Sequence, residues 1–209
     1  MTDYVEKVME KVKETLEKQP DQSVAHRFDH LDRVRKRAIF LTKLIKEGQK
    51  EIEIDLEILQ IAALLHDIEQ PYNKRKKDHV EMSIRKAMNI LKELDYPKRH
   101  RVLKVIAEHS LEDPKKSTSI EAKILFDADK LDGFGYIGMA RVFAYGGQQG
   151  MSLEKTIKWY REEIKKAKGQ MRTIEAKRLC AESEKSVSDF LENIEKEKEF
   201  LERIDIFLS

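Results

Sequence analysis

The 209-residue chain has little of what disulfide-rich, membrane-spanning or strand-rich proteins need. Its single cysteine, Cys180, cannot form an internal disulfide, so no covalent cross-link within the chain is expected. The best apolar run, at 61–65, is far shorter than the roughly 20 residues that cross a bilayer. Only 8 glycines and 4 prolines interrupt the chain, beside abundant Lys, Glu, Leu and Ile. This composition favours long helices over a strand-rich fold.

An excess of charge of one sign is also missing. The 41 basic and 39 acidic residues leave a formal net charge of +2. This balance gives no electrostatic reason to expect a nucleic-acid polymer or an anionic membrane as a partner. The first residues lack the basic-then-apolar order of a signal peptide. We therefore expect a cytoplasmic protein that binds neither.

The apolar residues recur at helical spacing between interleaved charges, which predicts an all-α fold of about eight helices. Asp55 and Ser119 are expected to begin two of them. Glycines at 133 and 135 end one helix, and those at 146, 147 and 150 predict a loop that could act as a lid. The expected helices cover residues 3–18, 24–46, 56–66, 79–94, 97–109 and 119–131, followed from residue 153 by two or more long charged helices joined near Gly169.

Several polar side chains lie where core residues belong. His66 follows apolar residues at i−7, i−4 and i−3, so it extends the buried stripe of its helix. His30, His79, His109 and Asp129 lie on the apolar stripes of four other predicted helices. Burying such groups is costly unless they are paired, hydrogen-bonded or bound to a metal. A single buried histidine or aspartate is more often a core residue with its hydrogen bonds satisfied. Five such residues on five different helices indicate instead that their side chains meet at one site.

Imidazoles and carboxylates are good ligands for divalent ions such as Mn²⁺, Fe²⁺, Co²⁺, Ni²⁺ and Zn²⁺. The adjacent pair His66 and Asp67 ends a predicted helix, where both side chains can turn toward one ion. A site without thiolates is unlike a closed structural zinc site and leaves positions open for water or substrate. We therefore expect a divalent metal cofactor, with Mn, Co, Ni, Fe, Mg and Zn all open.

These residues and their context resemble the H…HD…D signature of the HD-domain metal-dependent phosphohydrolase superfamily. The segments 25–34, 62–68 and 127–132 carry the resemblance, and 135–143, 156–160 and 171–173 resemble a branch of small bacterial and archaeal HD hydrolases. The resemblance covers roughly residues 20–200 and implies a helical bundle with the metal between core helices. It also implies hydrolysis of phosphate esters or phosphoanhydrides, often in nucleotides. The implied metal ligands are His30, His66, Asp67 and Asp129.

Three further histidines take part in this resemblance. His26 matches an upstream histidine of the family and is expected to support the site by lining the pocket or pairing with a carboxylate. His79 and His109 fit the order of the additional histidines with which some HD proteins hold a second metal. The alternative, which we favour, is a one-metal site in which both imidazoles contact substrate phosphate.

The catalytic roles are expected to fall on residues beside the ligands. Asp67 would both ligate and orient the attacking water, with Glu69 or Asp132 as a nearby acid or base. A solvated loop position is an equal alternative for Glu69. Lys130, next to Asp129, is expected to direct its ammonium group at a phosphate, rather than to pair with a neighbouring aspartate.

Other charged residues are expected to support the site. Arg33 is interpreted as a phosphate clamp, with pairing to Asp29 as the alternative. Asp127 and Asp132 are expected to hold ligands or Lys130 in orientation. A basic run at 74–77 is more typical of a solvated loop than of a substrate funnel. Trp159 and Tyr160, on an amphipathic helix, are expected in the core or at an interface.

Together these patterns predict one domain over residues 1–209, with a metal-site core at about 20–145 and C-terminal helices at about 151–209. The expected function is metal-dependent hydrolysis of nucleotides or similar small phosphorylated metabolites. Two alternatives stay open: a di-iron oxygenase on the same scaffold, and a metal- or nucleotide-binding regulator without turnover. The oligomeric state stays open, although the charged terminal helices could mediate a homodimer.

Overall fold

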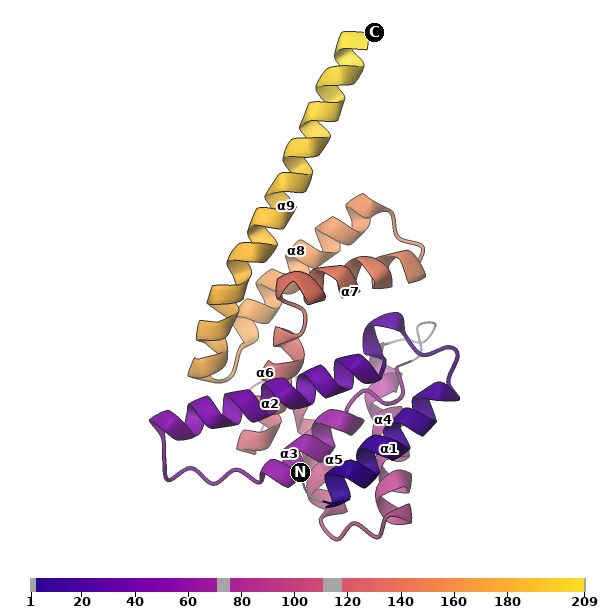
Figure 1. Ribbon diagram of the computed structural model, residues 1–209, viewed down its shortest axis with the longest axis vertical. Helices are drawn as coiled ribbons and strands as arrows, with labels where there is room; N and C mark the ends of the chain where they lie inside the picture. The colour runs from indigo at the N-terminus through magenta and orange to yellow at the C-terminus, as the bar shows by residue number, and fades with distance from the viewer. Residues whose placement is uncertain (1–2, 71–75, 111–117, 209) are drawn as a thin grey trace.

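The computed structural model describes residues 3–70, 76–110 and 118–208. These residues form helices and contain no strand, which confirms the all-α prediction (Figure 1). The helices are α1 (Asp3–Glu17), the 3₁₀ turn η1 (Val24–His26), α2 (Phe28–Gly48), α3 (Leu56–Leu65), α4 (Lys76–Glu93), α5 (Arg99–His109), α6 (Ile120–Leu131), α7 (Gly135–Gln148), α8 (Leu153–Gln170) and α9 (Ile174–Leu208).

The helices begin where the sequence supplies caps and apolar stripes. The Asp55 carboxylate accepts a hydrogen bond from the Ile58 amide at 3.2 Å, and the Ser119 hydroxyl accepts one from the Ala122 amide at 3.2 Å. Each bond satisfies an amide that has no partner within its own helix. Both predicted caps are confirmed.

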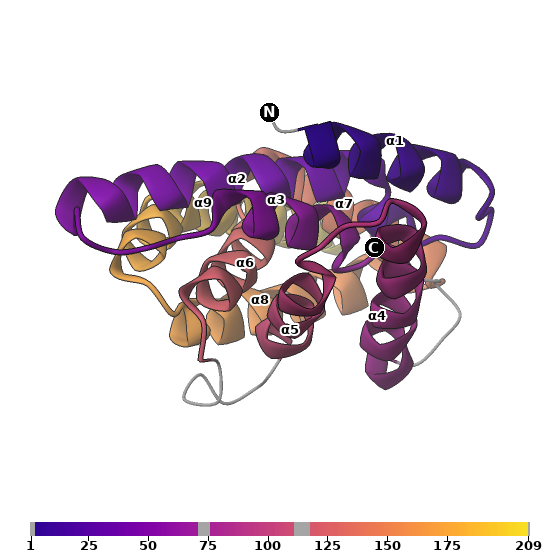
Figure 2. The same ribbon diagram turned by 90° about the horizontal axis from the view of Figure 1, so that it is seen from below.

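The main core lies between α2, α3, α5 and α6. Helix α3 is buried from Ile58 to Leu65, where it packs against α1, α2, α5 and α6, because this stretch is almost entirely apolar. Figure 2 shows α4, α5 and α6 lying below α2 and α3. A second, smaller apolar cluster joins α7, α8 and α9 through Met139, Ile157, Tyr160, Val187 and Leu191. That residues 1–209 act as one domain stays a prediction.

Two sequence predictions of local structure are wrong. The expected loop near Gly146 is helix α7 through Gln148, and the chain turns only after it. Gly146 is buried and its position faces the Thr156 side chain on α8, so it serves close packing rather than a turn. The single helix expected at 24–46 is broken at Arg27, whose backbone is extended between η1 and α2.

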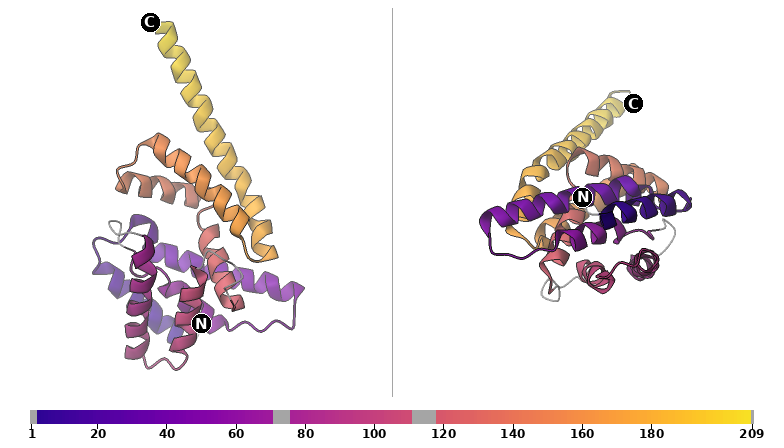
Figure 3. Two further views of the ribbon diagram at one scale, coloured as in Figure 1. Left: turned by 180° about the vertical axis from the view of Figure 1, so that it is seen from behind. Right: turned by 60° about the horizontal axis from the view of Figure 1, so that its bottom comes forward.

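The predicted join near Gly169 is confirmed, because α8 ends at Gln170 and α9 begins at Ile174. Helix α9 runs back alongside α8, and its C-terminal end extends beyond the other helices (Figure 3). In the described part of the chain, none of the helices combines the length and apolarity needed to cross a membrane.

Candidate metal centre

Four side chains from three helices meet at one point in the core. His30 comes from α2, His66 and Asp67 end α3, and Asp129 lies near the end of α6. One ligand atom from each lies within 4.8 Å of all the others. The Nε2 atoms of His30 and His66 are 3.6 and 3.7 Å from Oδ1 of Asp129. The structure therefore brings together the four residues that the resemblance implied as ligands.

The two imidazoles are arranged as metal ligands would be. Nδ1 of His30 lies 2.8 Å from Oδ2 of Asp132, and Nδ1 of His66 lies 2.9 Å from the Ala63 carbonyl oxygen. A proton on each Nδ1 satisfies these acceptors and leaves a lone pair on Nε2. Both Nε2 atoms are buried without a hydrogen-bond partner and face carboxylates. A divalent cation fits this donor set, because it would satisfy two buried lone pairs and two carboxylates at once.

The charges of the cluster reinforce one another. Burial opposes the charge on His66, but Asp67 and Asp129 outweigh it and raise the pKa of His66 to about 9. Burial also opposes ionisation of Asp129, but Lys130 and His66 hold its pKa well below the usual range. Without a metal, the His66 proton supplies the positive charge that the carboxylates require.

Asp132 supports the site from behind His30. Its fully buried carboxylate also accepts hydrogen bonds from Arg33 (3.0 Å) and Arg141 (2.5 Å). Burial opposes ionisation, but His30 and these arginines lower the pKa of Asp132 to about 2. The carboxylate is therefore anionic and fixes the orientation of His30, the supporting role that the sequence predicted. It faces away from the metal cluster, so the alternative of an acid or base gains no support.

Three more histidines, His26, His79 and His109, surround the cluster. Nε2 of His26 and Nε2 of His79 lie 3.9 and 3.8 Å from the two carboxylate oxygens of Asp67. The His109 ring contacts the His66 ring edge-on, with centroids 5.2 Å apart. Burial lowers the pKa of His26 to about 3 and that of His109 to about 4, so both are neutral. Pairing with a carboxylate was one of the expected roles of His26.

Two predicted site residues point elsewhere. Arg33 binds Asp29 at 2.5 Å and Asp132 at 3.0 Å, so its guanidinium is held by carboxylates rather than presented to a phosphate. The Glu69 carboxylate accepts a hydrogen bond of 2.7 Å from Gln19, which joins the segments that follow α3 and α1. Neither residue lines the cavity described below. The alternative of Arg33 paired with Asp29 is the one that the structure contains.

Asp127 is also placed differently from the prediction. Its buried carboxylate accepts hydrogen bonds from the amides of Arg172 and Thr173, both at 2.8 Å, and from the Thr173 hydroxyl at 2.7 Å. It therefore anchors the connection between α8 and α9 to α6, rather than orienting a ligand or Lys130. The basic side chains at 74–77 lie outside the described residues.

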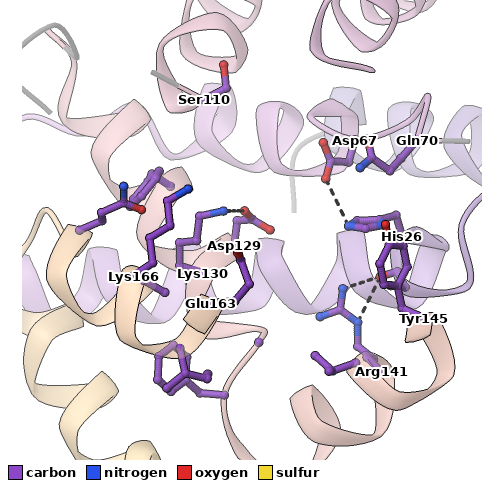
Figure 4. Close-up of a pocket in the computed structure, with 18 of the residues that line it drawn as sticks. His26, Asp67, Gln70, Ser110, Asp129, Lys130, Arg141, Tyr145, Glu163 and Lys166 are labelled. Atoms are coloured by element: carbon purple, nitrogen blue, oxygen red, sulfur yellow. Dashed lines mark hydrogen bonds and ion pairs between the residues drawn. The ribbon is translucent and has the colours of Figure 1, made fainter. Parts of the chain in front are cut away.

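A cavity of about 560 Å³ opens onto the candidate centre (Figure 4). Asp67 and Asp129 line it, together with the predicted substrate contacts His79, His109 and Lys130. The Lys130 ammonium lies 3.2 Å from Oδ2 of Asp129, whose negative charge raises the pKa of Lys130. Lys130 is therefore a fixed cation in the wall, beside Asp129 rather than paired with Asp127 or Asp132.

Sequence reasoning missed the residues that α7 and α8 contribute to this cavity, which include Arg141, Tyr145, Trp159, Glu163 and Lys166. The spacing of 159, 163 and 166 is that of one helix face, which was a usable signal. Charged residues on such a face look the same in sequence whether they meet solvent or a ligand. Tyr160 is in the core, as expected, and its hydroxyl donates to the Gly133 carbonyl at 2.7 Å.

Comparison with known proteins gives consistent matches. Residues 27–133 match the model of the HD domain. YpgQ of Bacillus subtilis, described as an uncharacterized protein, is 29% identical over 187 residues, which span 85% of this chain and 86% of YpgQ. The crystal structure of YpgQ in complex with ADP has a TM-score of 0.70 at 25% identity, over 92% of this chain and 97% of that one. The structure of an HD-superfamily hydrolase from Bacillus thuringiensis has a TM-score of 0.68 at 31% identity, over 94% and 97% of the two chains.

Proposed function

Because this chain belongs to the HD domain family and has the fold of HD-superfamily hydrolases, we propose that it is a metal-dependent phosphohydrolase. Its substrates are nucleotides or similar small phosphorylated metabolites, in which it cleaves a phosphate ester or phosphoanhydride bond. The observation that carries the proposal is the pair of buried, unpartnered Nε2 atoms of His30 and His66, which face Asp67 and Asp129.

A divalent ion bound by His30, His66, Asp67 and Asp129 would supply an acidified water and polarise a phosphoryl oxygen. The protein's own residues complete the chemistry. Asp132 keeps the His30 proton on Nδ1, which presents Nε2 to the centre. Asp67 is an ionised carboxylate at the cavity wall, where it can accept a hydrogen bond from the attacking water.

The cavity also suits an anionic, phosphorylated substrate. The fixed positive charge of Lys130 stabilises a phosphoryl group as negative charge accumulates on it. The imidazoles of His79 and His109 line the same space and can contact phosphoryl oxygens. The volume of about 560 Å³ lies within the range of roughly 300–1,000 Å³ that is typical of small-molecule sites. The ADP in the YpgQ crystal structure supports a nucleotide as the ligand here.

The test is release of phosphate or pyrophosphate from a nucleotide panel with Mn²⁺, Co²⁺, Ni²⁺ or Mg²⁺. We expect metal-dependent turnover that Asp129→Asn abolishes and that His100→Ala, which changes an exposed histidine outside the cavity, leaves intact. Inactivity of the folded, metal-loaded protein on the whole panel would contradict the proposal. Saturable nucleotide binding without product would instead support the non-catalytic regulator.

One observation favours a second candidate. Nε2 of His79 lies 3.8 Å from the Asp67 oxygen that does not face His66, so Asp67 could bridge two ions. A di-iron oxygenase would require His79 and His109 as additional ligands. Elemental analysis distinguishes the di-iron oxygenase from the one-metal phosphohydrolase, because one metal ion per chain is incompatible with a di-iron site.

We also propose a homodimer through the end of α9. The apolar stripe that is buried at Val187 and Leu191 continues into the exposed side chain of Leu201, and Phe200 is exposed beside it. A second copy would remove this surface from water. Light scattering should give twice the chain mass for the wild type and the mass of one chain for Leu201→Asp. A wild type of single-chain mass would rule the dimer out.

A further inference from the structure

The two sides of the cavity differ in chemistry. Figure 4 shows Lys130 and Lys166 on one side of Asp129, and His26, Gln70 and Tyr145 on the other. One side therefore carries ammonium groups. The opposite side carries rings and an amide, together with Arg141, whose guanidinium is held by the Ala25 carbonyl and by Asp132. The candidate metal centre, with Asp67 and Asp129, lies between them.

An aromatic pair forms part of the second side. Tyr145 of α7 and Trp159 of α8 both line the cavity and are half-buried, with ring centroids 5.5 Å apart and planes inclined by 36°. Tyr145 also meets the His26 ring edge-on at 6.4 Å, and His26 lies 3.9 Å from Asp67. A continuous series of rings therefore leads from the metal centre to Trp159.

The same side holds a polar group without a partner. The side-chain oxygen of Gln70 is buried, has no hydrogen-bond partner and belongs to a residue that lines the cavity. An amide oxygen accepts hydrogen bonds, so a ligand that supplies an N–H or O–H group would satisfy it. A phosphate dianion offers no donor, whereas a nucleobase amino group or a ribose hydroxyl does.

We propose that Gln70, Tyr145 and Trp159 form a nucleoside subsite, in which the base packs against the aromatic pair and the phosphates extend toward Lys130 and Lys166. This inference rests on the proposed function, because it assigns the orientation of a nucleotide in the same site. Stacking uses the π-face that every base has. The subsite therefore selects nucleotides over phosphorylated compounds that lack an aromatic ring, and it discriminates weakly between bases.

The chain contains one tryptophan, so its fluorescence reports directly on the subsite. Titration of ADP into the wild-type protein should quench Trp159 saturably, and ribose 5-phosphate at equal occupancy should not. Isothermal titration should find ADP binding about 5- to 100-fold weaker in Trp159→Leu, with ribose 5-phosphate binding unchanged. Trp159→Phe, which keeps an aromatic face, should retain most of the affinity.

Tyr145→Leu provides a second variant in which Trp159 still reports binding, and it should also weaken ADP selectively. Tyr136→Leu is the matched control, because Tyr136 lies on the same helix with 78% of its surface exposed. The subsite is ruled out if ADP leaves the wild-type fluorescence unchanged, or if the Trp159 and Tyr145 variants weaken ADP and ribose 5-phosphate equally.

The two proposals fail in different ways. If the protein binds ADP selectively through Trp159 but hydrolyses nothing, the nucleoside subsite is supported and the phosphohydrolase activity is contradicted. If the protein hydrolyses nucleotides and ribose 5-phosphate with equal, metal-dependent efficiency, and Trp159→Leu has no effect, the subsite is contradicted and the phosphohydrolase activity is supported.

Discussion

Nδ1 of His30 lies 2.8 Å from Oδ2 of Asp132, a carboxylate that has no exposed surface. The two residues are 102 positions apart in the sequence, on α2 and just after α6. Through this contact the end of α6 positions a histidine on another helix, while Asp129, one turn earlier, faces the same histidine from the cavity side.

Replacement of Asp132 by asparagine should weaken metal binding. The asparagine side-chain oxygen can still accept the hydrogen bond from His30 Nδ1–H, but the negative charge that favours a cation on the far side of the ring is lost. We expect the Kd for Mn²⁺ or Zn²⁺, measured by isothermal titration, to rise by about 10- to 100-fold. Asp29→Asn is the matched control, because Asp29 also binds Arg33 but is exposed. Equal affinities for wild type and Asp132→Asn would show that this contact has no role at the centre.

Metal affinity should rise with pH. The pKa of His66 in the metal-free protein is raised from 6.5 to about 9, and an imidazole binds metal only after its Nε2 proton has left. At pH 7 each ion bound should therefore release about one proton, and the apparent affinity should increase up to tenfold per pH unit until about pH 9. Isothermal titration in buffers of different ionisation enthalpy counts these protons. An affinity that stays flat between pH 6.5 and 9 would contradict the protonated state of His66.

Removal of the Lys130 charge should impair turnover without impairing metal binding. Lys130→Gln removes a cation from the phosphate side of the cavity, and a charged hydrogen bond of this kind corresponds to about 10- to 100-fold in kcat/KM for a nucleotide. Metal affinity should be equal or higher, because the lost positive charge lies 3.2 Å from Asp129. Lys123→Gln on the same helix, outside the cavity, should leave kcat/KM unchanged. A lower metal affinity in Lys130→Gln would show instead that the loss of turnover comes from damage to the metal centre.

The turn between α6 and α7 should not tolerate a side chain at Gly138. A methyl group there would overlap the carbonyl group of Gly133, so backbone next to Asp132 would have to move. We expect Gly138→Ala to lower the free energy of unfolding by about 1–3 kcal/mol in urea denaturation. In Gly147→Ala, on the same helix, the added methyl group meets no atom within 4 Å, so this substitution should raise the free energy of unfolding by up to about 1 kcal/mol. Equal midpoints for the two variants would contradict this close packing.

Local sequence patterns were sufficient to predict much of the fold and the histidines and aspartates of the candidate metal centre. The stripe that leads to His66 marks a buried face, and the cost of burying an imidazole there implies a partner. The same argument applied to His30 and Asp129. Asp55 and Ser119 could be predicted because a cap acts within one turn of its own helix.

Contacts between distant segments could not be predicted in this way. Asp127 binds Thr173, 46 residues later, and Arg33 binds Asp132, 99 residues later. Periodicity shows whether such a side chain points inward, but it does not identify the segment that it will meet. Helix α7 was missed for a related reason, since Gly146 provides space for the Thr156 side chain on α8 and resembles a turn glycine in sequence.

Anomalous diffraction from crystals of the protein loaded with Mn²⁺ tests whether His30, His66, Asp67 and Asp129 hold one divalent ion. We predict a strong anomalous peak about 2.0–2.3 Å from Nε2 of His30, Nε2 of His66 and one carboxylate oxygen each of Asp67 and Asp129. Fully loaded crystals that show no peak among these four side chains, or a peak held by other residues, would contradict the account.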